Sequence, residues 1–278
     1  MTSIETAACR PDVAELLRIA VDVVRLAAET AQAMRAEAIR DPATKTTRTD
    51  VVTAADRAVE RMVVAHLHQA RPGDTVLGEE FGATADGAAA EGAVRWVLDP
   101  IDGTVNYLYG VGPYAVSLAA EIDGRTVCGV VRDATTGEEW TAVRGGGAFR
   151  DGRRLTGSAV TDLGQALIAT GFAYDAARRA HQARVLAGLL PEVRDIRRLG
   201  AAAVDLCLAA EGRVDAYFEK GLNHWDYAAG ALIAQEAGLL VTGLAGAPAG
   251  SEFVLAAPPG IRDVLHDRLV ALDAAGGP

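Results

Sequence analysis

Cysteine is scarce in this chain of 278 residues, and neither a secretory-signal pattern nor a long apolar run occurs in it. Cys9, Cys128 and Cys207 lie far apart and form no C-x-x-C or Cys/His ligand pattern, which excludes a disulfide framework and a structural zinc site. Residues 1–10 have no basic and no apolar region of a secretory signal. No run reaches the ~18 apolar residues of a membrane span. We therefore expect a cytoplasmic protein without a membrane partner.

The chain also has no excess of positive charge and no nucleotide-binding glycine motif. The chain has 27 Lys and Arg against 37 Asp and Glu, a net charge of −10. This balance argues against a protein that grips nucleic-acid phosphates. It leaves an anionic small substrate open, because bound cations reverse the local field. No G-x-G-x-x-G or G-K-[ST] pattern follows a predicted strand, which argues against a nucleotide cradle.

Aromatic residues make up only 5% of the chain, whereas half of it is hydrophobic, so Ala, Val, Leu and Gly must form the core. Apolar spacings of three and four predict helices over residues 11–39 and from about residue 53. Asp123-Gly124 predicts a hairpin between strands at 115–122 and 126–131. Strand and helix patterns alternate from about residue 151. This order predicts a layered α/β fold with sub-domains 1–150 and 151–278.

The segment over residues 96–107 organises the rest of the chain. A short apolar run predicts a buried strand that ends at Pro100, with Asp99 and Asp102 on either side of the proline. Gly103 and Thr104 then suit a tight turn that exposes backbone N–H groups at a helix start. Carboxylates bind hard divalent cations, and such N–H groups bind phosphate. The motif therefore predicts a metal-assisted phosphate site, although alone it equally fits a strand-to-helix turn with an aspartate cap.

Four further carboxylates stand at predicted strand ends or helix starts, where loops converge on one edge of a sheet. They are Asp56, Glu79, Glu219 and Asp226. Each alone also fits a residue that compensates a helix dipole. If five of these six carboxylates converged, like charges ~4 Å apart would repel by about 4 kcal/mol per pair at an effective dielectric near 20. A convergent cluster would need divalent cations, and oxygen ligands favour Mg²⁺.

The motifs together resemble the inositol monophosphatase family, closest to the bacterial inositol-1-monophosphatase type. The resemblance covers residues 11–272 and is carried by Asp56, GEE at 78–80, DPIDGT at 99–104 and WDYAAG at 225–230. It implies a layered α-β-α-β-α sandwich of the sugar-phosphatase type. It also implies a Mg²⁺-dependent, lithium-sensitive phosphatase that forms a homodimer. Ala201, where the family often has threonine, is one departure near the substrate.

The resemblance also implies roles for individual residues. One metal would be held by Glu79, Asp99 and the Ile101 carbonyl. A second would be held by Asp99, Asp102 and Asp226, and Glu79 with waters would hold a weaker third. Thr104, paired with Asp56, would orient and deprotonate the attacking water. The resemblance assigns phosphate binding to the Gly103 and Thr104 amides, a mobile loop to Lys45, and substrate contacts to Asp102, Gly200, Ala201, Ala202, Glu219 and Asp226.

The predicted reaction is hydrolysis of a phosphate monoester by activated water, without a phosphoenzyme. In this reading the N-terminal sub-domain carries most metal ligands, and the C-terminal one completes the substrate pocket. The preferred substrate is inositol 1-phosphate, a small phosphorylated polyol. Histidinol phosphate, fructose 1,6-bisphosphate and a phosphoadenosine nucleotide remain alternatives, as does a regulatory partner of RNA or the transcription machinery. Cys207 lies mid-helix and is not expected to be a nucleophile, and His224 is expected to pack beside the pocket.

Overall fold

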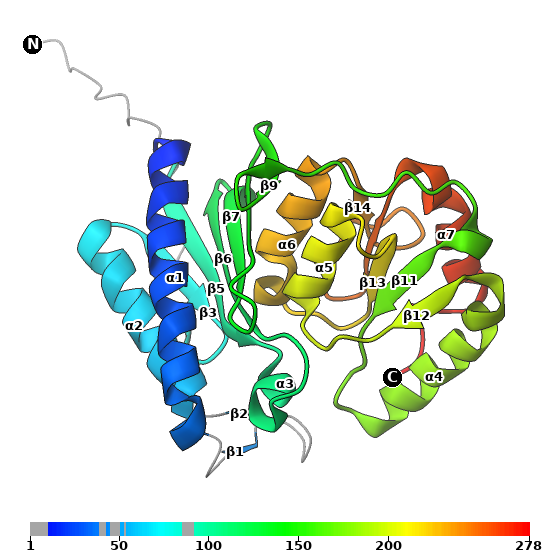
Figure 1. Ribbon diagram of the computed structural model, residues 1–278, viewed down its shortest axis with the longest axis horizontal. Coiled ribbons are helices and arrows are strands. Elements are labelled where there is room, and N and C mark those ends of the chain that lie inside the picture. The colour runs from blue at the N-terminus through cyan, green and yellow to red at the C-terminus, as the bar shows by residue number, and fades with distance from the viewer. Residues whose placement is uncertain (1–10, 39–42, 45–50, 53, 85–91) are drawn as a thin grey trace, which may run out of the picture.

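Helices and sheets alternate in five layers, α-β-α-β-α, across the molecule (Figure 1). The computed structural model describes residues 11–38, 43–44, 51–52, 54–84 and 92–278. The helical layers pair α1 (Val13–Ala38) with α2 (Ala54–Ala70), α5 (Ala202–Glu211) with α6 (His224–Glu236), and α4 (Ala176–Leu189) with α7 (Pro259–Ala271). The layered fold predicted from the sequence is confirmed. None of the helices in the described part of the chain could cross a membrane.

The first sheet has eight strands in the order β10-β9-β8-β7-β6-β5-β3-β4. Only β3 and β5 pair in parallel within it. Asp123 and Gly124 join β6 to β7 with φ angles of 51° and 72°, the left-handed conformation of a tight hairpin turn, as predicted. The strands are β3 (Thr75–Gly78), β4 (Gly82–Ala83), β5 (Val94–Asp102), β6 (Ala115–Ile122), β7 (Arg125–Asp133), β8 (Glu139–Val143), β9 (Gly147–Arg150) and β10 (Arg153–Arg154).

Strand β5 does not end at Pro100, which corrects the sequence-based expectation. It continues to Asp102, and its pairing with β6 shifts between Asp99, opposite Ser117, and Asp102, opposite Ala115. Three steps along β5 thus match two along β6, which is a bulge, and a bulge tolerates a proline without a ladder hydrogen bond. Residues three apart on a regular strand face opposite sides. The extra residue lets Asp99 and Asp102 line the same pocket.

The second sheet has five strands in the order β12-β11-β13-β15-β14. The pairs β12 with β11 and β11 with β13 are parallel, and the pairs β13 with β15 and β15 with β14 are antiparallel. Parallel strands are joined by helices, which is the alternation that the sequence shows after residue 151. The strands are β11 (Leu167–Thr170), β12 (Asp195–Arg197), β13 (Ala216–Glu219), β14 (Leu240–Thr242) and β15 (Val254–Ala257). The remaining elements are β1 (Ala43–Thr44), β2 (Val51–Val52), α3 (Thr104–Tyr109) and two 3₁₀ turns, η1 (Leu163–Gln165) and η2 (Leu190–Glu192).

Small residues let the middle helices sit tightly against their neighbours. A Cβ atom built on Gly129 of β7 would lie 2.9 Å from the Ala229 Cα of α6, and one on Gly230 would lie 2.9 Å from the Leu206 Cβ of α5. Helices α5 and α6 lie between the two sheets and share one buried cluster with strands of both (Figure 1). The buried clusters consist mainly of Ala and aliphatic residues, with a few aromatic side chains such as Trp96, Trp140 and Tyr217 among them.

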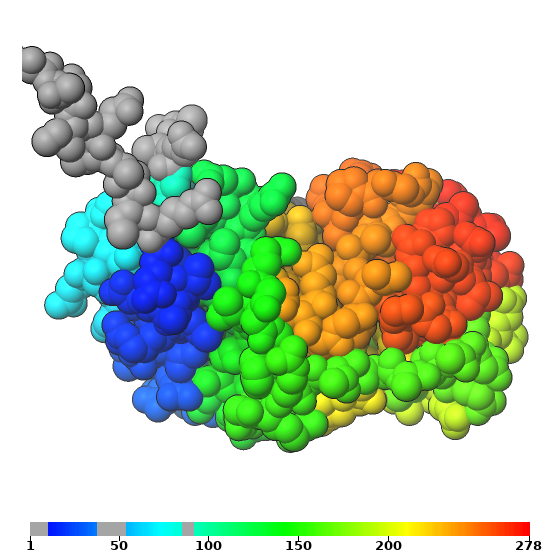
Figure 2. Space-filling view, turned by 90° about the horizontal axis from the view of Figure 1, so that it is seen from above, coloured from blue at the N-terminus to red at the C-terminus, as the bar shows by residue number. Residues whose placement is uncertain are grey.

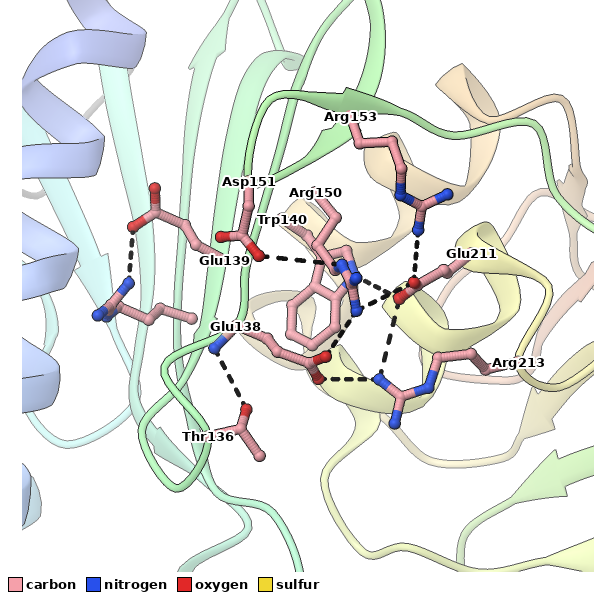
Figure 3. Close-up of polar contacts among 10 residues, drawn as sticks. Thr136, Glu138, Glu139, Trp140, Arg150, Asp151, Arg153, Glu211 and Arg213 are labelled. Atoms are coloured by element: carbon pink, nitrogen blue, oxygen red, sulfur yellow. Dashed lines mark hydrogen bonds and ion pairs between the residues drawn. The ribbon is translucent and has the colours of Figure 1, made fainter.

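Charged side chains tie the two sequence halves together at one edge of the molecule. Glu211, at the end of α5, accepts from Arg153 at 2.6 Å and from Arg150 at 3.1 Å, and Trp140 Nε1 donates to it at 3.4 Å (Figure 3). The chain after β10 crosses from the first sheet towards the far layer along this edge (Figure 2). The division into sub-domains 1–150 and 151–278 stays a prediction.

Candidate active site

One cavity of about 470 Å³ collects five of the six predicted carboxylates, from both halves of the chain. Asp99 and Asp102 reach it from the end of β5, Glu219 from the end of β13, and Asp226 from the first turn of α6. Glu79 follows β3 directly. Of the other predicted site residues, the cavity wall includes Ile101, Gly103, Thr104, Gly200 and Ala202. Lys45 lies outside the described residues.

Asp99 and Glu79 repel each other in this cavity. Asp99 is only 2% exposed, and its carboxyl group is close enough to that of Glu79 to share a proton. Burial raises the pKa of Asp99 well above its usual range, and the charges of Glu79, Asp102 and Asp226 raise it further. The pKa of Asp226 is likewise raised by burial and then by Glu79 and Asp102. These carboxylates therefore favour the binding of either protons or cations between them.

Asp102 joins the two halves of the site. Its Oδ1 accepts the Ala202 N–H at 3.1 Å and its Oδ2 accepts the Ala203 N–H at 2.7 Å, at the start of α5. Burial raises the pKa of Asp102 to about 7, although these two hydrogen bonds oppose the shift. An ionised carboxylate has about four lone-pair sites, so two backbone donors leave acceptor capacity on both oxygens. Asp102 thus anchors α5 and still faces the cavity.

Thr104 and Asp56 meet behind the cavity floor. The Thr104 hydroxyl lies 3.3 Å from Asp56 Oδ1 and 3.2 Å from the Ile101 carbonyl oxygen, and it can donate its single proton to either. Asp56 is fully buried in the first turn of α2, whereas Thr104 opens α3. Gly103 precedes it at φ 87°, and a Cβ there would lie 3.0 Å from the Pro113 carbonyl oxygen. The glycine is required because no other residue fits this turn without strain.

Glu60 is a part of the site that the sequence analysis missed. It is 1% exposed on α2, and its Oε2 and Oε1 accept the N–H groups of Glu80 at 2.8 Å and Phe81 at 3.0 Å. A Cβ at Gly78 would lie 2.1 Å from Glu60 Oε1, so this close approach requires glycine. Glu60 therefore holds the turn that presents Glu79. The sequence feature that could have identified Glu60 is its position four residues after Asp56, on the same face of a buried helix.

The Glu219 end of the cavity has a different character. Tyr217 donates to Glu219 Oε2 at 2.6 Å, and burial raises the pKa of Glu219 to about 6, against the opposing effects of Tyr217 and the Arg198 charge. Glycine at position 171 makes room for this carboxylate, because a Cβ there would lie 1.8 Å from it. Ala201, expected to touch substrate, is 1% exposed and packs under Gly103, so its side chain does not line the wall.

Other reactive side chains lie away from the cavity. His224 lies 2.6 Å from Glu121 and stacks edge-on against Tyr227, which agrees with the predicted packing role. Cys207 is fully buried, and burial raises the pKa of its thiol well above the usual range. Because thiolates are the nucleophilic form, a raised pKa makes this cysteine inert.

The donor set fits a hard divalent cation by its chemistry. It consists only of carboxylate, carbonyl and hydroxyl oxygens, and the carboxylates repel one another at close range. Within the described ranges, no group of three or more His, Cys, Asp or Glu side chains is already arranged to hold a metal ion.

Known proteins are similar to this chain in both sequence and fold. The model of the inositol monophosphatase family matches residues 12–273. The chain is 50% identical over 240 residues to inositol-1-monophosphatase of Mycobacterium leprae, covering 84% of this chain and 81% of that protein. It is 43% identical over 200 residues to Nus factor SuhB of Pseudomonas aeruginosa, covering 71% and 73%. The structure of Mycobacterium tuberculosis SuhB superposes with a TM-score of 0.80 at 40% identity, covering 95% and 99%.

The family model and the structural match span nearly the whole chain, and the sequence identities far exceed what a shared fold alone produces. They make the protein an enzyme that hydrolyses phosphoric monoesters, in a family whose members generally depend on metal. With its carboxylates gathered at one cavity, the chain is a member of the inositol monophosphatase family.

Proposed function

We propose that the protein hydrolyses inositol 1-phosphate to inositol and phosphate in a Mg²⁺-dependent reaction. The observation that carries this proposal is the meeting of Glu79, Asp99, Asp102 and Asp226, from both halves of the chain, at one cavity where their charges repel. Relatives named inositol-1-monophosphatase, at 48–50% identity, support the choice of substrate.

Four carboxylates and one carbonyl would hold two or three magnesium ions. Glu79, Asp99 and the Ile101 carbonyl would form one site, Asp99, Asp102 and Asp226 a second, and Glu79 with waters a third. Bound magnesium neutralises phosphoryl oxygens and makes water more acidic. The charge that spreads over the phosphoryl group in the transition state explains why this chemistry needs cations.

The chain itself would position the water and the phosphate. Thr104 Oγ1 would accept a hydrogen bond from the attacking water while it donates to Asp56, which would take up the proton; the contact of 3.3 Å between Thr104 Oγ1 and Asp56 Oδ1 supports this role. The amides of Gly103 and Thr104 would receive the phosphate oxygens. Glu219, at the far side of the cavity, would accept hydrogen bonds from ring hydroxyls, with Gly200 and Ala202 beside it. Water attacks directly in this scheme, so no phosphoenzyme forms.

The test is phosphate release with and without Mg²⁺ from wild type, Asp99→Asn and a control, Asp195→Asn. Asp195 is a partly exposed carboxylate on β12 that pairs with Arg197, away from the cavity. Asp99→Asn should abolish the Mg²⁺-dependent rate, and the control should keep it. Near-normal activity of Asp99→Asn would refute the site. A substrate panel with histidinol phosphate, fructose 1,6-bisphosphate and a phosphoadenosine nucleotide decides the substrate, and preference for one of these would displace inositol 1-phosphate.

Other finer features belong to the same proposal. They are lithium inhibition, a homodimer in solution and a cytoplasmic location. Dose–response curves with LiCl and light scattering on the purified protein test the first two. A lithium-insensitive monomer would remove both features and leave the hydrolytic reaction as proposed.

A second role, as a partner of the transcription machinery or of RNA, is supported by the relatives named Nus factor SuhB at 38–43% identity. The net charge of −10 favours a protein partner over direct contact with nucleic acid. Pull-down with purified RNA polymerase, with and without RNA, tests it. A stable complex together with an inactive, metal-loaded protein would make this the main role.

A further inference from the structure

Of the predicted metal ligands, Asp226 alone comes from the second half of the chain. It stands in the first turn of α6, whereas the other four come before residue 103. Helix α6 packs on the first sheet, in the layer between the two sheets (Figure 1). The position of its first turn on that sheet therefore decides how closely Asp226 approaches the other carboxylates.

The carboxylate of Asp226 is tied to that turn. Its Oδ2 accepts the backbone N–H of Asn223, the residue just before α6, at 2.6 Å. This is the bond that an acidic residue in the first turn of a helix makes back to the N-cap residue. Asp226 also lines the cavity. A shift of the first turn of α6 would therefore carry this carboxylate with it.

A buried carboxylate of the first sheet holds the first residue of α6. His224 Nε2 lies 2.6 Å from Oε1 of Glu121, which stands 103 residues earlier on β6 and is only 2% exposed. An ionised carboxylate only accepts hydrogen bonds, so the histidine nitrogen is the donor. Glu121 lies on the same face of β6 as Ala115 and Ala119, which belong to the buried cluster that the sheet shares with α5 and α6. The contact therefore links the start of α6 to the sheet that carries the other carboxylates.

Glu121 is itself fixed by its neighbours in the sheet. Arg95, its partner on β5, donates to Oε2 from Nε at 3.1 Å and from Nη2 at 2.6 Å, and Thr126 Oγ1 donates to Oε1 at 3.3 Å. Burial raises the pKa of Glu121, but the hydrogen bonds from His224 and Arg95 outweigh burial and bring this pKa below its usual range. The ring of His224 also packs edge-on against Tyr227, with ring centres 5.2 Å apart. Both members of the pair are thus held in one place.

We infer that Glu121 and His224 are positioning residues, which together set how closely Asp226 approaches the carboxylates of the first sheet. They thereby set the affinity of the cation site that Asp226 completes. The inference rests on the proposed function, in which Asp99, Asp102 and Asp226 hold one cation. Neither Glu121 nor His224 is among the described residues that line the cavity, so both act through α6.

The test compares His224→Asn, His224→Gln, Glu121→Ala and the double variant Glu121→Ala/His224→Asn with wild type. The amide nitrogen of glutamine reaches about as far from the backbone as histidine Nε2, whereas that of asparagine falls one methylene short. His224→Gln therefore keeps a donor for Glu121, and His224→Asn does not. His181→Asn is the matched control, because His181 Nε2 also makes one contact, of 2.8 Å with the Asp273 carbonyl oxygen, and the residue is 9% exposed on α4.

Mn²⁺ binding is measured by electron paramagnetic resonance without substrate, together with the Mg²⁺ concentration for half-maximal phosphate release and the melting temperature. We expect His224→Asn and Glu121→Ala each to weaken Mn²⁺ binding about tenfold and to raise the Mg²⁺ requirement similarly, with a smaller change in kcat at saturating Mg²⁺. His224→Gln should restore most of the Mn²⁺ affinity, and His181→Asn should bind Mn²⁺ like wild type. The double variant should bind Mn²⁺ no more weakly than Glu121→Ala alone, because both changes break the same contact.

Three results would each overturn the inference: wild-type Mn²⁺ affinity in His224→Asn, no gain of affinity in His224→Gln over His224→Asn, or an equal loss in His181→Asn. If the melting temperature shows that Glu121→Ala does not fold, the two His224 variants decide alone. Failure of the proposed function looks different, because the wild type would then show no Mg²⁺-dependent phosphate release from any substrate.

Discussion

Replacing Glu60 by Gln tests whether a buried carboxylate holds the turn that presents Glu79. The glutamine fits the same space, but its amide nitrogen cannot accept a hydrogen bond. One of the two backbone donors, the N–H of Glu80 or of Phe81, therefore loses its partner inside the protein. Glu60 is only 1% exposed, so water does not replace the lost acceptor.

The expected loss of stability follows from two opposing effects. A hydrogen bond to a charged group contributes about 1.5–3 kcal/mol, and leaving a buried donor unsatisfied costs about 1–3 kcal/mol. Burial raises the pKa of Glu60, so the ionised side chain carries a desolvation cost that neutral glutamine avoids. We expect a net loss of about 2 kcal/mol, which lowers Tm by about 4–8 °C in a protein of this size.

The assay that separates positioning from stability is cation binding. Mn²⁺ binding is followed by electron paramagnetic resonance without substrate, and the Mg²⁺ concentration for half-maximal activity is measured in parallel. Substitution of a residue that orients a metal ligand typically lowers metal affinity 10–100-fold. We expect Glu60→Gln to weaken Mn²⁺ binding about tenfold and to raise the Mg²⁺ requirement similarly, while kcat at saturating Mg²⁺ falls less.

The chain offers a matched control in Glu236. Its carboxylate also accepts two backbone N–H groups of one turn, those of Gly145 at 2.8 Å and Gly147 at 2.9 Å, but it lies on α6 far from Glu79 in the fold. Glu236→Gln should lower Tm by less, because this carboxylate is partly exposed, and should leave Mn²⁺ affinity unchanged. If both variants bound Mn²⁺ like wild type, Glu60 would be a structural residue only.

The remaining predictions concern charge. Asp99→Asn should raise the Tm of the cation-free protein, because it removes one of four repelling carboxylates, and a lower Tm in chelator would contradict this. Burial raises the pKa of Asp102 to about 7 and that of Glu219 to about 6, so the folded state binds more protons than the unfolded state between about pH 4 and 7. Cation-free stability should therefore fall as pH rises through this window, and a free energy of unfolding in urea that is equal or higher at pH 8 than at pH 5 would refute it. Glu211→Gln should lower the free energy of unfolding, measured in urea, by about 1–3 kcal/mol, because Arg150 and Arg153 lose their buried anionic partner (Figure 3). The kcat should not change.

Local sequence patterns were sufficient to predict much of the fold and the chemistry of the candidate site. Apolar spacing predicts α1, whose bounds are Val13–Ala38, and Asp123-Gly124 predicts the β6–β7 hairpin. Five of the six predicted carboxylates at strand ends and helix starts line one cavity, and the sixth, Asp56, reaches it only through Thr104. These features are readable because each depends on residues within about one turn of helix or one strand, where periodicity and turn chemistry act.

Contacts between distant parts of the chain decided the rest. Asp102 accepts the amides of Ala202 and Ala203, about a hundred residues later, and no local pattern marks a helix cap that comes from another layer. The bulge in β5 depends on how β6 pairs with it, so Pro100 seemed to end a strand that in fact continues. Lys220 meets the backbone of Gly276 and Gly277, more than fifty residues later, only because the chain folds back onto it. The sequence thus determined which side chains could do chemistry, and packing of the layers determined which of them meet, because that depends on the burial of the whole core.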